Sequence, residues 1–311
     1  MNNNDFEFNY FGFDKLNFVA KNLTDILFGE AEELSISSIL EKICVSPPYF
    51  AFKKIYRYKN ILIAQITPEQ PIDDEIVTMS IGEAGRHMAI LGTCACALDQ
   101  EEKYYYLVKD AKITLETRNI SSLCNKSNLY IAVETGYVDK KIATTNGILF
   151  NDKKNAIYHL NCSYNKIKTA IFNKLFAKYR SDTIETKNNP YKEPILFDDV
   201  EAGDNKLFSI MPEISKERCV GHFREYPILP TAFVIYNLLS HAGNFLLKRT
   251  NKKRYYISEV HLSLFELLYL SSKKEIRISY LAMNDNFYKM NCKIIQDGKQ
   301  NSHVSFLIHC I

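Results

Sequence analysis

The chain has 311 residues, of which 46% are hydrophobic and 24% are charged, and its formal net charge is +3. Charges this nearly balanced exclude a protein that coats a polyanion such as nucleic acid, although they permit a local basic patch for an acidic partner. The length suits two domains of about 100–150 residues each, large enough to bury substantial cores.

The cysteines and the apolar stretches indicate the cellular compartment of the protein. The eight cysteines, among them Cys94, Cys96 and Cys124, form no Cys-x-x-C pair and no Cys/His zinc spacing. We therefore expect buried, reduced thiols and no metal site. The first residues lack the pattern of a signal peptide, and the longest apolar stretch, 88–98, is shorter than the ~18 residues of a membrane span. We expect a cytoplasmic protein that does not enter a membrane.

The first half of the chain predicts one long helix among strands. Residues 52–66, rich in Ile, Tyr and Phe, predict a strand, and a polar loop separates them from a helix over 80–98. Further strands are expected over 103–116 and 128–138, followed by a hairpin whose loop is 151–155.

The second half predicts the same order. A strand beginning at 207 leads through a Pro-bounded loop to a helix over 231–248. Strands follow over 254–266 and 275–284, and then a hairpin with Asp297-Gly298 as its turn, a dipeptide that reaches positive φ easily. Given twice, this order predicts an α+β protein with two antiparallel sheets, each wrapped around a long central helix.

Between the halves, residues 168–180 have the pattern of an amphipathic helix, and the polar segment 181–191 contains Pro190 and is the best candidate for a linker. The expected parts are an N-terminal extension, a first domain, a connecting helix with its linker, and a second domain: 1–40, 41–167, 168–200 and 201–311.

The most specific motif runs from Gly221 to Pro230 and reads G-H-F-R-E-Y-P-I-L-P, followed by an apolar helix as far as Gly243. It resembles the G-H-F-P-x-x-P-x-x-P segment of the β-hydroxyacyl-acyl-carrier-protein dehydratases. The resemblance is close over 221–243, and the order of strands extends it over about 200–311. It implies the hotdog fold of that family, and the repeat implies a double hotdog.

The spacing of this motif has a physical rationale. Two prolines fix a tight loop in front of the helix, so that His222 points into a cleft. Beyond Pro230, the backbone N–H groups of Thr231 and Ala232 lie at a helix N-terminus, where they suit a thioester oxygen that gains negative charge. We therefore expect His222 to be catalytic, and we expect Pro230, Thr231 and Ala232 to bind substrate.

The dehydratase family also has an acidic residue on this helix, six residues beyond the second proline, where this chain has Tyr236. The first-half helix supplies a carboxylate: Glu83-Ala84-x-x-His87 is similar to the family's Glu-Ala-x-x-Gln and to the second half-motif of polyketide synthase dehydratase domains. The loop before that helix has no histidine. The resemblance thus implies one composite site of Glu83 and His222, with His87 orienting Glu83 and Tyr236 marking a decayed second site.

From this site we predict dehydration of a 3-hydroxyacyl thioester to the 2-enoyl thioester, in fatty-acid or polyketide biosynthesis. His222 takes the α-proton and Glu83 delivers a proton to the departing hydroxyl. The expected partner is an acyl carrier protein or acyl-CoA, no cofactor is needed beyond the phosphopantetheine arm that the substrate carries, and the protein is expected as a monomer or homodimer of double hotdogs.

Two alternatives stay open. One is acyl transfer, decarboxylation or thioester hydrolysis through Tyr236 or Tyr49, as in enzymes resembling the leinamycin-type double-hotdog acyltransferase/decarboxylase. The other is a non-catalytic acyl-binding unit, which the loss of the acidic residue at position 236 favours. The acidic run at 73–75 is expected to be a solvated loop, and the basic run at 248–254 either a solvated loop or a contact for a phosphate or an acidic carrier.

Overall fold

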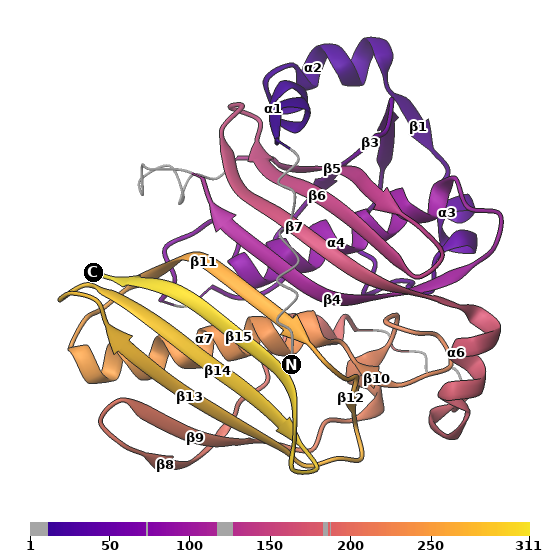
Figure 1. Cartoon of the computed structure of the whole chain (residues 1–311). Coiled ribbons are helices and arrows are strands. Elements are labelled where there is room, and N and C mark those ends of the chain that lie inside the picture. Colours follow the sequence, from indigo (N-terminus) through magenta and orange to yellow (C-terminus); the bar gives the residue numbers. More distant parts are fainter. Residues whose placement is uncertain (1–11, 73, 117–126, 183–185, 187) are drawn as a thin grey trace, which may run out of the picture.

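The computed structural model describes residues 12–72, 74–116, 127–182, 186 and 188–311. The described residues form one continuous antiparallel sheet of 13 strands and two long helices, α4 (Ile81–Leu98) and α7 (Thr231–Thr250). Figure 1 shows the two halves one above the other, each with its long helix against its own part of the sheet. The predicted double hotdog architecture is confirmed.

The strands of the first half surround α4. The strand expected over 52–66 is a hairpin, because the chain turns at Lys59, whose φ is 55°. In sheet order the strands are β1 (Glu32–Leu34), β2 (Ile55–Tyr58), β3 (Ile61–Ile66), β5 (Leu129–Val138), β6 (Ile142–Asn151), β7 (Ala156–Lys168) and β4 (Tyr104–Leu115).

The strands of the second half surround α7. The predicted tight turn is present, since Asp297 and Gly298 both have positive φ, 50° and 77°. In sheet order the strands are β11 (Tyr255–Leu264), β15 (Lys299–Cys310), β14 (Phe287–Gln296), β13 (Lys274–Ala282), β9 (Lys206–Met211) and β8 (Asp198–Ala202).

Two contacts join the halves. Strand β4 pairs with β11, in a register that runs from Thr114 opposite Glu259 to Asp110 opposite Ser263. The helices also touch, and a Cβ built on Gly82 would lie 2.8 Å from the Cα of Tyr236. Only glycine lets the two helix backbones approach this closely, so the N-terminal turns of α4 and α7 lie side by side.

The N-terminal elements cover the outer face of the first half of the sheet. Alternate residues of a strand point to opposite faces, so Leu62 and Ala64 join the main core, whereas Ile61 and Ile63 pack with Leu16 and its neighbours. The remaining elements are α1 (Asp14–Lys21), α2 (Leu23–Asp25), η1 (Ile26–Glu30), α3 (Ile36–Lys42), α6 (Thr169–Leu175), η2 (Ala177–Tyr179), η3 (Pro190–Lys192), η4 (Lys216–Cys219), β10 (Ile228–Leu229) and β12 (Leu268–Tyr269).

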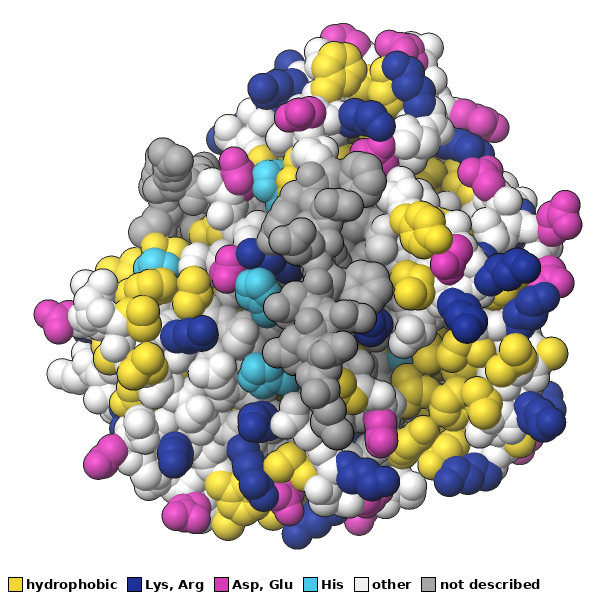
Figure 2. All heavy atoms as spheres, in the orientation of Figure 1, with side chains coloured by type: hydrophobic (Ala, Val, Ile, Leu, Met, Phe, Trp, Pro, Cys, Tyr) yellow, Lys and Arg dark blue, Asp and Glu magenta, His cyan; other side chains and the backbone are white. Residues whose placement is uncertain are grey.

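The distribution of charged side chains on the surface agrees with the near balance of charge in the sequence. Figure 2 shows basic and acidic side chains interspersed over one face rather than gathered in a single basic stripe. Within the described ranges, no helix is long and apolar enough to cross a membrane. The cysteines of those ranges are all free, and Cys124 lies outside them.

Candidate functional site

A cavity of about 610 Å³ lies between the two long helices. Gly85 and Arg86 of α4 line it together with Ile235 and Leu239 of α7, and strands of both halves complete a largely apolar wall. An apolar cleft with a few polar groups is the usual form of a small-molecule site, and this volume accommodates an acyl chain. His222 lines the cavity and is partly buried.

The loop before β10 holds His222 in a defined orientation. Gly221 has a φ of 84°, and a Cβ there would lie 2.3 Å from the carbonyl oxygen of Ser46, so only glycine fits. Nδ1 of His222 lies 3.0 Å from the carbonyl oxygen of Ile228. Because that oxygen can only accept, Nδ1 carries the hydrogen and Nε2 keeps its lone pair. Nε2 has no hydrogen-bond partner among the residues that the structure describes.

Burial sets the protonation state of His222. It lowers the pKa of the imidazole to about 4, against a smaller opposing effect of the Ile228 carbonyl. The ring is therefore neutral at neutral pH, as a general base must be. The ring of Tyr49, another residue of the cavity wall, meets the His222 ring edge-on, with the ring centroids 5.0 Å apart.

The first turn of α7 supplies hydrogen-bond donors beside His222. Pro230 is the N-cap and makes no side-chain cap, while its carbonyl oxygen accepts from Phe233 and Val234. In the described part of the chain, the N–H groups of Thr231 and Ala232 have no acceptor, and both residues line the cavity. Pro230 itself is buried and does not line it. The structure thus brings His222, Thr231 and Ala232 to one cavity.

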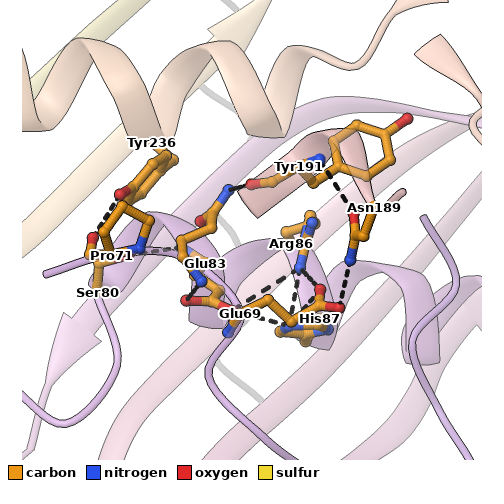
Figure 3. A network of polar contacts seen from close by, with 10 residues as sticks. Glu69, Pro71, Ser80, Glu83, Arg86, His87, Asn189, Tyr191 and Tyr236 are labelled. Atoms are coloured by element: carbon orange, nitrogen blue, oxygen red, sulfur yellow. Dashed lines mark hydrogen bonds and ion pairs between the residues drawn. The ribbon is translucent and has the colours of Figure 1, made fainter. Parts of the chain in front are cut away.

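Glu83 is placed differently. Its side chain is 0% exposed and does not line the cavity. Its carboxylate accepts from the backbone N–H groups of Glu69 at 2.6 Å and Gln70 at 3.3 Å (Figure 3). Glu83 therefore fixes the loop before α4 to the helix, and the structure does not bring Glu83 and His222 together at the cavity.

Around Glu83 lies a buried ion-pair network (Figure 3). Arg86 forms a salt bridge with Glu69 through Nη2, which also lies 3.1 Å from Nε2 of His87. As predicted, His87 contacts Glu83, with Nε2 3.4 Å from the carboxylate. Burial and the neighbouring Arg86 lower the pKa of His87, so that its ring is neutral. Glu69, Glu83 and His87 could in principle bind a metal ion, because their ligand atoms lie within 4.8 Å of one another. The guanidinium of Arg86 lies among them and already supplies the positive charge that a metal ion would bring.

Tyr236 also serves the loop before α4. Its hydroxyl donates to the carbonyl oxygen of Pro71 at 2.6 Å (Figure 3). Its backbone packs against Gly82. Tyr236 does not line the cavity. Among the residues that we did not select from the sequence, Arg86 is the most prominent in the wall. Its signal was a guanidinium in a helix rich in apolar residues, since arginine is rarely buried without a partner.

The acidic run before α4 is not a solvated loop throughout, as we had expected. Asp74 is exposed, whereas Glu75 is 7% exposed and accepts from the N–H of Ile81; Asp73 lies outside the described residues. Burial raises the pKa of Glu75 to about 8. The expectation was wrong because the next residue, Ile76, pairs with the carbonyl oxygen of Tyr255 in the other half and draws the run inward.

Comparisons with known proteins support the fold. No family model and no curated protein matches the sequence. Among solved structures, a tesB protein of Mycobacterium avium subspecies paratuberculosis is 8% identical with a TM-score of 0.54 and covers 89% of this chain and 100% of its own. A proposed oleoyl thioesterase of Lactobacillus plantarum is 12% identical with a TM-score of 0.56 and covers 81% and 95%. A conserved protein of unknown function with a hotdog fold from Alicyclobacillus acidocaldarius is 8% identical with a TM-score of 0.51 and covers 86% and 99%.

These similarities correct the predicted reaction. The resemblance to dehydratases holds for the hotdog fold but not for that family, because the similar structure whose name states an activity is a proposed oleoyl thioesterase. The prediction of dehydration is therefore wrong. The geometry gives a physical reason, since the carboxylate that was to protonate the leaving hydroxyl faces N–H donors of a loop and not the cavity.

Proposed function

We propose that the chain is an enzyme that hydrolyses acyl thioesters. The supporting observation is the pairing of a neutral histidine, whose Nε2 has no partner in the described structure, with the unbonded first N–H groups of α7 at one apolar cavity. Hydrolysis needs a base for water and donors for the charge that develops on the carbonyl oxygen. The thioesterase name of a similar structure agrees with this proposal.

The reaction follows from these groups. Nε2 of His222 accepts a proton from water as the water oxygen bonds to the thioester carbonyl carbon. The carbonyl oxygen takes the negative charge and accepts from the N–H groups of Thr231 and Ala232, which the positive end of the α7 dipole reinforces. As the carbonyl re-forms, the C–S bond breaks and the departing thiolate takes the proton from Nε2, giving a free acid and a thiol.

The cavity determines the orientation of the bound substrate. Its apolar interior suits the acyl chain, and the partly buried His222 loop is the side from which the carrier arm leaves. We propose acyl-CoA or an acyl carrier protein as the partner, with the phosphopantetheine arm belonging to the substrate.

Release of free thiol from a series of acyl-CoA thioesters tests this proposal. We expect His222→Gln to lower kcat/KM by roughly 10²- to 10⁴-fold, the usual contribution of a positioned base. The matched control is His241→Gln on α7, because His241 bonds Ser209 and Asp199 and does not line the cavity. A wild-type protein that releases no thiol, or full activity in His222→Gln, would contradict the proposal.

A further inference from the structure

Two polar side chains in the cavity wall have donors that the protein does not use. Arg86 is 1% exposed, and its Nε and Nη1 have no partner among the described residues. Tyr49 is 5% exposed, and its hydroxyl makes no hydrogen bond within the same residues. Burial raises the pKa of Tyr49 to about 12, so the hydroxyl keeps its proton. Buried donors without an acceptor are rare and destabilising, so those of Arg86 need an explanation.

Three other hydroxyl groups of the same wall are already bonded. Tyr106 donates to the carbonyl oxygen of Cys96 at 3.2 Å, and Thr93 and Tyr164 both donate to that of Ala89. Arg86 and Tyr49 therefore differ from these three residues in having donors that the described residues leave unused.

The charges near Arg86 indicate which acceptor fits. Its guanidinium lies beside the carboxylates of Glu69 and Glu83, and the neighbouring His87 is neutral. The positive charge is thus already compensated, and a further carboxylate would meet two like charges. A neutral oxygen, from a hydroxyl or keto group, accepts the unused N–H groups without that repulsion.

The position of these donors indicates which part of the substrate they meet. The ring of Tyr49 contacts His222, and the Arg86 guanidinium carbon lies 5.6 Å from the centroid of the same ring. His222 is partly exposed, whereas Arg86 and Tyr49 are buried. In the substrate orientation proposed above, both residues therefore lie inward of the thioester, on the side of the acyl chain, and the contact of Tyr49 with His222 places them near its carbonyl.

We propose that Arg86 and Tyr49 select acyl chains that carry a hydroxyl or keto oxygen close to the thioester. This inference rests on the proposed thioesterase activity for the orientation of the substrate. A site with buried donors discriminates strongly against a ligand that leaves them unpaired.

The test compares two substrates that differ by one oxygen. Octanoyl-CoA and 3-hydroxyoctanoyl-CoA are compared in hydrolysis, and their non-hydrolysable thioether analogues are compared in binding by calorimetry. We expect roughly 10- to 100-fold tighter binding of the hydroxylated analogue, with a similar preference in kcat/KM. The wild-type comparison does not depend on any variant folding.

Two variants then assign the preference to residues. Tyr49→Phe removes only the hydroxyl, and Arg86→Lys keeps the charge beside Glu69 but removes the planar set of donors. Each should reduce the binding ratio towards one. Tyr106→Phe is the matched control, because its hydroxyl already donates to Cys96, and it should keep the ratio.

Equal binding of the two analogues by the wild type overturns the inference, as does a ratio that neither Tyr49→Phe nor Arg86→Lys changes. Tighter binding of an acyl analogue with a carboxylate in place of the hydroxyl also overturns it. Preferential binding without hydrolysis of either thioester rejects the thioesterase proposal alone, and hydrolysis with equal binding rejects the selection alone.

Discussion

The two long helices begin in equivalent places of the two halves, but their first turns differ. At α4, the Ile81 N–H is bonded to the carboxyl group of Glu75, and the side chain of Ser80 accepts from Glu83 at 3.2 Å. At α7, Pro230 provides no side-chain cap, and the N–H of Thr231 has no acceptor in the described structure. The start of α4, the closed helix start, is thus capped by side chains of the protein itself, whereas the start of α7, the open helix start, has no side-chain cap and lines the cavity.

This difference shows how, in a repeated fold, one helix start can serve stability and the equivalent helix start can serve the reaction. The first N–H groups of any helix lack an intrahelical acceptor, so a cap stabilises the helix, whereas uncapped groups are available for a ligand. In the first half, Glu83 and its neighbours use the helix start to hold a loop. In the second half, the same position faces His222 and the proposed thioester.

The largest expected effect concerns the closed helix start. Glu83→Ala removes the acceptor of two loop N–H groups and one of the carboxylates beside Arg86. We expect a loss of about 3–5 kcal/mol in the free energy of unfolding, measured with urea, because buried partners are left unpaired. The control Glu102→Gln, which breaks an exposed ion pair with Lys168, should change little. Equal stability of the two variants would show that the network does not hold the loop.

A smaller effect should depend on pH. The pKa of Glu75 is raised from 4.5 to about 8 in the folded protein, so the native state binds this proton more tightly than the unfolded state does. Its contribution is therefore most favourable below pH 4.5 and is lost as the pH rises towards 8. Glu75→Gln lacks this titration, and its stability relative to the wild type should improve by about 3 kcal/mol between pH 5 and pH 8. A difference that stays constant with pH would rule out a buried, protonated Glu75.

The open helix start was predictable from the sequence because its determinants are local. His222, Pro230 and Thr231 lie within ten residues, and the proline spacing and the apolar helix define the loop without knowledge of the rest of the fold. The turn at Asp297 and Gly298 was predictable for the same reason.

The role of Glu83 was not predictable, because it depends on a loop that a distant segment holds in place. Glu83 is bonded to a loop 14 residues earlier, and Tyr236, which fixes that loop, lies 165 residues after Pro71. A carboxylate in the first turn of a helix has the same sequence pattern whether it faces a substrate or a loop. The predicted reaction was wrong for the same reason, since dehydration required Glu83 at the cavity.

The central claim is that the open start of α7 stabilises the charge on the thioester oxygen. Thr231→Pro tests it directly, because proline removes the backbone N–H while its fixed φ suits the first position of a helix. The reference is Thr231→Ala, which loses the side chain but keeps the N–H. We predict that kcat/KM for an acyl-CoA thioester is roughly 10²- to 10³-fold lower in Thr231→Pro than in Thr231→Ala, the usual effect of losing one such donor, with little change in the free energy of unfolding. Equal rates of thioester hydrolysis in the two folded variants would contradict the account.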